Sequence, residues 1–128
     1  MKKIVLDASA MLALLNEEPG SEKLTPEMLN NSIGSTVNLA EVQTKLVSRG
    51  EAANEAWEDA LSAIQESVPF TEEQAKIAGG LAAQTRSLGS SLGDRACLAL
   101  GLVSKAPIYT TDRSWKDLNI GVRIHVIR

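Results

Sequence analysis

Ile4-Val5-Leu6-Asp7-Ala8-Ser9-Ala10 is the stretch that decides the fold. The three apolar residues that open it suit a short buried strand. Residues 8–15 follow at once and have the apolar content of a helix. Asp7 stands between them, where an acidic side chain is a good helix N-cap. The stretch therefore predicts a strand that leads directly into a helix.

The same alternation of short apolar runs and helical stripes continues along the chain. Strands are predicted over residues 3–6, 33–37, 68–70, 107–110 and 123–127. Helices are predicted over residues 8–15, 21–29 with an interruption at Pro26, 38–48, 51–65, 71–88 and 94–103, with a helical turn at 114–118. Strands that are separated by helical crossovers indicate a parallel sheet covered on both faces. We predict a single α/β domain over residues 1–128.

Composition sets limits on the function. The chain has 128 residues, a hydrophobic fraction of 44% and a net charge of −3. A negative charge argues mildly against nucleic-acid binding, unless acidic residues bind cations that offset it. The single cysteine, Cys97, excludes an intrachain disulfide. The first apolar run is too short for a signal peptide, and no run approaches the ~20 residues that span a bilayer, so we expect a soluble cytoplasmic protein without membrane contact.

Four acidic residues each have an ordinary local explanation. Asp7 and Asp112 follow predicted strands, and each could cap the next helical turn. Asp94 would begin its helix after Gly93, where a negative charge suits the helix dipole. Glu41 lies three residues after Asn38, so it could close a capping box or pair with Lys45 four residues on.

The same four acids share a predicted location. The carboxyl ends of parallel strands and the first turns of the following helices can converge on one edge of a sheet. Four carboxylates gathered there would repel each other unless cations lie between them. Carboxylate oxygens without a cysteine or histidine cluster select Mg²⁺ or Mn²⁺ over zinc. Carboxylate-bound divalent ions are one route to phosphodiester hydrolysis.

Other catalytic chemistry lacks suitable residues. The single histidine, His125, is expected to be half-buried on the last strand. Cys97 lies in an apolar helix and is expected in the core. The sequence shows no Ser/His/Asp nucleophile set and no glycine-rich phosphate loop. The acidic residues are therefore the leading candidates for a catalytic site.

Four motifs resemble those of PIN domains, in the same order and nearly end to end. Residues 4–10 resemble the opening motif, in which a metal-binding Asp is followed by Ser two positions on. Residues 38–42 resemble the second acidic motif and residues 109–115 the fourth. Residues 91–100 are similar to the third, and this is the longest and most specific match. The short chain and the third motif resemble the VapC-type toxins of bacterial toxin–antitoxin pairs.

The resemblance implies a three-layer α/β/α fold with a central, mainly parallel sheet. It implies an Mg²⁺- or Mn²⁺-dependent endoribonuclease that cleaves RNA, forms a homodimer and is held inactive by a cognate antitoxin. Asp7, Glu41, Asp94 and Asp112 carry over as the catalytic, metal-binding acids. The supporting hydroxyls carry over as Ser9 and Thr110, which orient the acids or a metal-bound water.

Substrate contacts are less defined by the motifs. Arg86, Arg95 and Arg113 could contact RNA phosphates, or they could pair with acids. Trp115 could stack on a base, whereas Trp57 lies in an apolar helical stripe and better suits the core or an interface. Alternative interpretations are a non-catalytic PIN-fold module that acts through a protein partner, a DNA-directed nuclease and a phosphatase.

Overall fold

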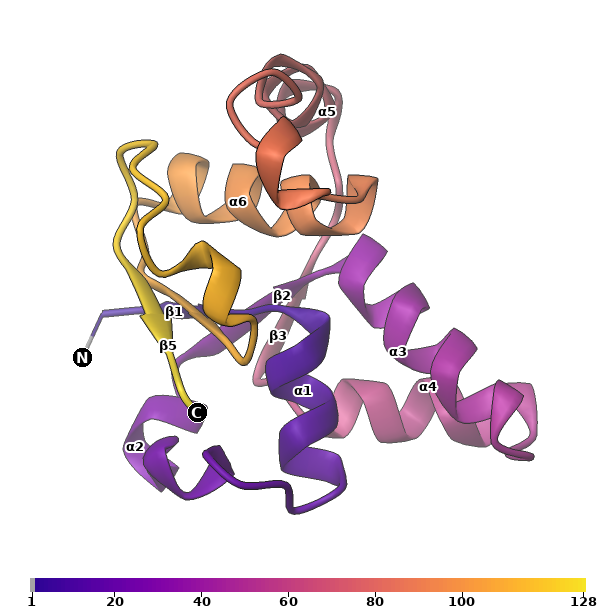
Figure 1. The fold of residues 1–128 in the computed structure, drawn as a ribbon. Helices are drawn as coiled ribbons and strands as arrows, with labels where there is room; N and C mark the ends of the chain where they lie inside the picture. The colour runs from indigo at the N-terminus through magenta and orange to yellow at the C-terminus, as the bar shows by residue number, and fades with distance from the viewer. Residues whose placement is uncertain (1) are drawn as a thin grey trace.

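A central sheet of short strands organises the computed structural model, which describes residues 2–128. The strands are β1 (Ile4–Leu6), β2 (Ser32–Ser35), β3 (Glu66–Val68), β4 (Ile108–Thr110) and β5 (Ile124–Val126). They lie in the order β3-β2-β1-β4-β5, and every neighbouring pair is parallel (Figure 1). The predicted parallel sheet is therefore confirmed.

Six α-helices connect the strands of the described chain: α1 (Ala8–Leu15), α2 (Pro26–Leu29), α3 (Thr36–Ser48), α4 (Ala53–Ser62), α5 (Glu72–Gly80) and α6 (Leu92–Ser104). Three single 3-10 turns supplement them: η1 (Ser21–Lys23), η2 (Arg86–Leu88) and η3 (Arg113–Trp115). No helix within residues 2–128 is both long and apolar enough to cross a membrane.

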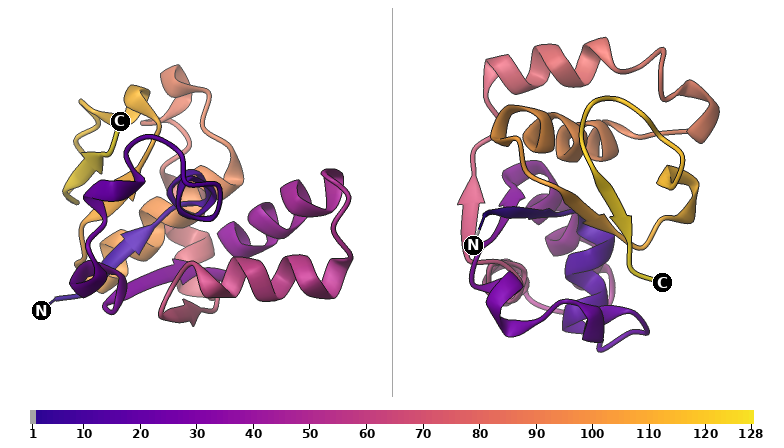
Figure 2. Two further views of the ribbon diagram at one scale, coloured as in Figure 1. Left: turned by 90° about the horizontal axis from the view of Figure 1, so that it is seen from below. Right: turned by 90° about the vertical axis from the view of Figure 1, so that its left-hand side faces the viewer.

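The helices cover both faces of the sheet and make the three-layer α/β/α arrangement that was predicted. Helices α5 and α6 lie on one face, and α1 to α4 lie on the other (Figures 1 and 2). Side chains along a strand alternate between faces. Accordingly, Ile4 and Leu6 pack into the core beneath α1, α3 and α4, whereas Val5 packs into the core beneath α6. The core beneath α6 also contains Trp115, which is 1% exposed.

Several helix boundaries differ from the prediction; α4, for example, covers Ala53–Ser62 rather than residues 51–65. Helix α3 begins at Thr36 rather than Asn38, because the hydroxyl of Ser35 accepts the N–H of Val37 and caps the helix. Helix α5 ends at Gly80, eight residues before the predicted end, which fits the high cost of consecutive glycines in a helix. Helix α6 begins at Leu92, since Ser91 caps it.

The parallel sheet has two chemically different edges. The carboxyl rim is the edge at which β1, β2 and β4 end, and Asp7 and Asp112 follow there. Asn38 of α3 donates to the carbonyl of Gly93, so the first turn of α6 also lies at this rim. The amino rim is the opposite edge, where β1, β4 and β5 begin and where α6 ends close to Lys105.

Candidate metal centre

Asp7 occupies the centre of the carboxyl rim and is 5% exposed. It caps α1, and its Oδ1 accepts the N–H of Ala10 at 2.8 Å and the hydroxyl of Ser9 at 2.7 Å. Its Oδ2 accepts the hydroxyl of Thr110 at 2.6 Å. Three donors on the two oxygens fix the orientation of this carboxylate.

The hydroxyls of Ser9 and Thr110 connect Asp7 to the loop after β4. Ser9 Oγ accepts the N–H of Thr111 at 2.9 Å, and Thr110 Oγ1 accepts the N–H of Asp112 at 3.0 Å. Each hydroxyl thus has a backbone donor of its own, which leaves its proton for Asp7. The two hydroxyls therefore orient Asp7 through both of its carboxylate oxygens.

Glu41 approaches the first turn of α6 from α3. Its Oε1 accepts Nδ2 of Asn38 at 2.8 Å, and the same nitrogen donates to the carbonyl of Gly93 at 3.0 Å. A Cβ at position 93 would collide with both carboxylate oxygens of Glu41. Gly93 is therefore the residue that lets the Glu41 carboxylate reach the rim.

The interpretation of Asn38 as the start of the helix is wrong, and Gly93 has a role that no local pattern predicts. Asn38 is not the helix cap, and Glu41 closes no capping box with it; the amide instead bridges Glu41 and Gly93 from a position that is 1% exposed. The only signal in the sequence was the three-residue spacing from Asn38 to Glu41. Nothing local indicated that Gly93 faces a residue on another helix.

Asp94 and Asp112 are also engaged in caps. Oδ2 of Asp94 accepts the N–H of Ser91 at 2.9 Å, which completes a capping box at the start of α6. Oδ1 of Asp112 accepts the N–H and the hydroxyl of Ser114 and caps η3. Asp112 is exposed, and its link to the other acids runs through Thr110.

Three of the four acids share one electrostatic environment. Burial raises the pKa of Asp7 to about 6 against the opposing effect of its hydrogen bonds, and the charge of Asp94 adds to the rise. Burial also raises the pKa of Glu41, again with a contribution from Asp94. The buried Cys97 beneath them has a pKa raised first by burial and then by the charges of Asp7, Asp94 and Glu41. Asp7, Glu41 and Asp94 are therefore brought together around one region.

The oxygen donors gathered here are of the kind that hard divalent cations prefer. The gathered groups are carboxylates, and within residues 2–128 neither of the two ion pairs involves any of them. Among those same residues, however, no three acidic, cysteine or histidine side chains converge closely enough to hold one ion as they stand. A cation would therefore have to draw Glu41 and Asp94 toward the fixed Asp7.

The candidate substrate-contacting residues differ in their availability. Arg86 is exposed on η2, and Arg113 is exposed and donates to the carbonyl of Arg128. Arg95 is partly buried and donates to the carbonyl of Ala78 on α5, so part of its guanidinium holds two helices together. Trp115 is 1% exposed and cannot stack on a base, which corrects that interpretation. Trp57 packs against the core beneath α1, as expected.

Comparison with known proteins identifies the family. The PIN domain family matches residues 4–120, which is most of the chain. The chain therefore belongs to the PIN domain family, whose members are generally nucleases that depend on divalent metal ions. A search of curated protein sequences gave no match.

Solved structures share the fold at low sequence identity. The VapBC2 complex of Rickettsia felis, bound to a DNA fragment from its promoter, is 16% identical with a TM-score of 0.74, and 98% of each chain is covered. VapC20 of Mycobacterium tuberculosis, a toxin that cleaves the Sarcin-Ricin loop, is 21% identical with a TM-score of 0.73, over 94% of this chain and 99% of that one. A toxin–antitoxin complex of Klebsiella pneumoniae is 14% identical with a TM-score of 0.72, over 94% and 95%.

Proposed function

We propose that this PIN domain is a divalent-metal-dependent endoribonuclease and the toxin of a type II toxin–antitoxin pair. The observation that carries the proposal is the carboxylate of Asp7, which is nearly fully buried, fixed by three donors and exposed to the charge of Asp94. Burial and the charge of Asp94 both disfavour the ionised form of this carboxylate. A bound cation would offset both effects.

Each residue at the rim would have a defined part in the reaction. Asp7, Glu41, Asp94 and Asp112 would hold the metal, and Ser9 and Thr110 would keep Asp7 in place. Asn38 would hold Glu41 against Gly93. A bound Mg²⁺ or Mn²⁺ supplies a water of lowered pKa and stabilises the leaving oxygen of a phosphodiester. A metal-bound water would need no histidine as a general base. The ring of His125 instead stacks on that of Tyr109.

RNA is the proposed substrate. Exposed Arg86 and Arg113, with the free part of Arg95, would contact phosphates. The fold shared with VapC20, which cleaves the Sarcin-Ricin loop, supports RNA over DNA.

A cognate antitoxin is the proposed protein partner. VapBC complexes and a further toxin–antitoxin complex are among the structures with this fold. We place the antitoxin on the helices between Ser21 and Gln65. A groove of about 270 Å³ lies there, and its lining mixes apolar side chains such as Leu29 and Ile64 with polar ones such as Asn30, together with Leu14 of α1. The toxin itself would be a cytoplasmic homodimer.

Cleavage of a mixed pool of structured RNAs tests the proposal. Purified protein without antitoxin would be incubated with Mn²⁺, Mg²⁺ or chelator, beside Asp94→Asn. We expect metal-dependent fragments that disappear in the variant, because the variant keeps the volume of the acid but loses its charge. Full activity in a folded Asp94→Asn variant would exclude the assignment. Cleavage of single-stranded DNA in preference to RNA would replace the proposed substrate.

Thermal unfolding separates a silent binding module from a selective nuclease. If the acids share one site, Mg²⁺ or Mn²⁺ should raise the Tm of the wild type by linkage. The increase should be smaller in Asp94→Asn. A wild type whose Tm does not respond to metal, and which cuts no RNA, would indicate a module that acts through its partner alone.

A further inference from the structure

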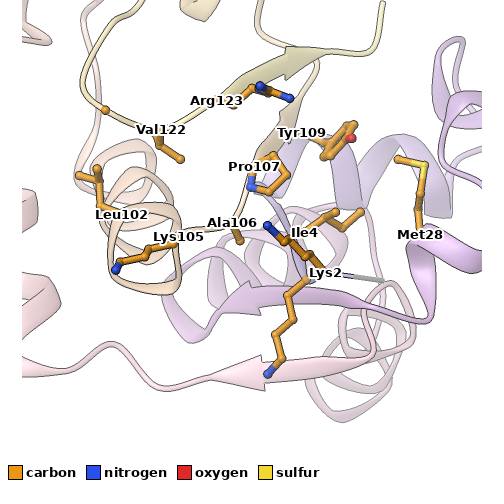
Figure 3. Close-up of a pocket in the computed structure, with 12 residues that line it drawn as sticks. Lys2, Ile4, Met28, Leu102, Lys105, Ala106, Pro107, Tyr109, Val122 and Arg123 are labelled. Carbon is orange, nitrogen blue, oxygen red and sulfur yellow. The ribbon is translucent and has the colours of Figure 1, made fainter.

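A second site lies at the amino rim, on the edge of the sheet opposite the acids. A depression of about 610 Å³ opens there, a size typical of sites for small ligands. It lies where β1, β4 and β5 begin and where α6 ends, and Pro107 forms part of its floor (Figure 3). Asp94 and Lys105 lie at opposite ends of α6, roughly 16 Å apart along the helix. The depression is therefore separate from the candidate metal centre.

The charge of this depression opposes that of the whole chain. Its lining contains Lys2, Lys3, Lys105 and Arg123 and no acidic residue, although the chain has a net charge of −3. Lys3 is paired with Glu66 at 2.9 Å in an exposed contact, which is worth little. In the described part of the chain, the other three form no ion pair. Figure 3 places Lys2, Lys105 and Arg123 at different sides of Pro107.

The remaining lining is apolar and includes an aromatic ring. Tyr109, Met28 and Ile4 lie on one side of Pro107, and Leu102 and Val122 lie on the other (Figure 3). The ring of Tyr109 stacks on that of His125, with centroids 4.7 Å apart and an interplanar angle of 17°. The stack holds the tyrosine ring in place as a wall. A flat, apolar ligand body would suit the space between these two walls.

We propose that the amino-rim depression binds a nucleotide. The base would lie against Tyr109 and Met28, and the phosphate would be bound by the surrounding cations, with Arg123 able to offer two parallel donors. An aromatic base with an attached phosphate matches both the apolar walls and the acid-free cationic rim. The nucleotide could be free or belong to an RNA strand, and experiment distinguishes these sources. The site requires no cleavage activity, so it stands apart from the proposed function.

Nuclear magnetic resonance titration of ¹⁵N-labelled protein tests this site directly. The probes are AMP, GMP, CMP and UMP, and a single-stranded RNA of ten nucleotides, all in chelator so that no metal-dependent cutting occurs. We expect shifts of amides around Pro107, Tyr109 and Arg123. Tighter binding of the strand than of any mononucleotide would make RNA the source. Equal or tighter binding of a mononucleotide would make it a free nucleotide.

Three variants connect those shifts to the depression. Arg123→Glu should weaken nucleotide binding at least about tenfold, because it replaces a phosphate donor with a like charge. Lys76→Glu makes the same change of net charge at an exposed site on α5 outside the depression, and it should have a much smaller effect. Lys105→Glu, at another side of Pro107, should weaken nucleotide binding in the same direction as Arg123→Glu.

Two results would overturn the proposal. One is the absence of amino-rim shifts with every nucleotide and with the RNA strand. The other is binding that Arg123→Glu and Lys76→Glu weaken equally, which would show only general electrostatic attraction. If a peptide of alternating Glu and Leu shifted these amides while no nucleotide did, the site would instead be a docking surface for an acidic protein.

Discussion

The two rims of the sheet use charge in opposite ways. At the carboxyl rim, Asp7 is short, buried and fixed by three donors. At the amino rim, Lys2, Lys105 and Arg123 are long, exposed side chains without ion pairs in the described chain. A fixed carboxylate can hold a metal ion in one geometry. Flexible cationic side chains instead attract anionic ligands without fixing one orientation. The two edges of one parallel sheet can therefore carry a rigid acidic site and a separate cationic surface.

The largest expected effect comes from closing the gap between α3 and α6. Gly93→Ala should reduce RNA cleavage by at least about 100-fold, or about 2.7 kcal/mol, because the new methyl group displaces Glu41 from the rim. Steady-state cleavage rates, with circular dichroism to check folding, measure this effect.

Gly79→Ala is the matched control for that change. Gly79 lies in α5, where a Cβ would meet nothing within 4 Å. Alanine there should stabilise the helix by up to about 1 kcal/mol and leave cleavage unchanged. If folded Gly93→Ala cuts RNA as fast as Gly79→Ala, the position of Glu41 does not matter to catalysis.

A second prediction concerns the pH dependence of stability in chelator. The pKa of Asp7 is about 6 in the fold and near 3.9 in an unfolded chain, so the folded state binds more protons between these values. Stability should therefore fall as the pH rises from about 4 to about 6, by up to about 3 kcal/mol. Asp7→Asn removes this titration and should show a flatter profile.

Urea unfolding at several pH values measures this difference. The comparison is the slope of unfolding free energy against pH, since the amide also changes the hydrogen bonds with Ser9 and Thr110. Identical slopes in the two proteins would mean that Asp7 is not strained by burial. Saturating Mg²⁺ should reduce the fall in the wild type, because bound metal favours the ionised acid.

The smallest effect is expected at the amino rim. Lys3→Gln breaks an exposed pair with Glu66, and the unfolding free energy should change by less than about 0.5 kcal/mol. Arg123→Gln should change it equally little, while it weakens nucleotide binding. A loss of several kcal/mol in either variant, measured by urea unfolding, would show that these cations support the fold rather than a ligand.

Local pattern predicted much of the fold and of the acidic site. The apolar run before Asp7 predicted β1. The apolar residues after Asp7 predicted α1 with its correct bounds. The order of elements then placed Asp7 and Asp112 at one edge. These features follow from residues close in sequence and from the general properties of parallel sheets.

Contacts between distant segments could not be predicted in the same way. Gly93 faces Glu41, and Asn38 bridges them, only after α3 and α6 pack together. The end of α5 at Gly80 depends on two opposing free energies: the cap at Thr71 stabilises the helix, and the two glycines destabilise it. The cluster of cations at the amino rim could not be predicted either, because Lys2, Lys105 and Arg123 are far apart along the chain.

Cys97 gives the molecule a built-in chemical reporter. It is the only thiol in the chain, it is 0% exposed, and it lies on α6 beneath the charges of Asp7, Glu41 and Asp94. A thiol reagent can therefore label one sulfur atom, and only while α6 is lifted from the sheet. The labelling rate thus records how often the carboxyl rim opens, and a ligand that binds the three acids should slow it.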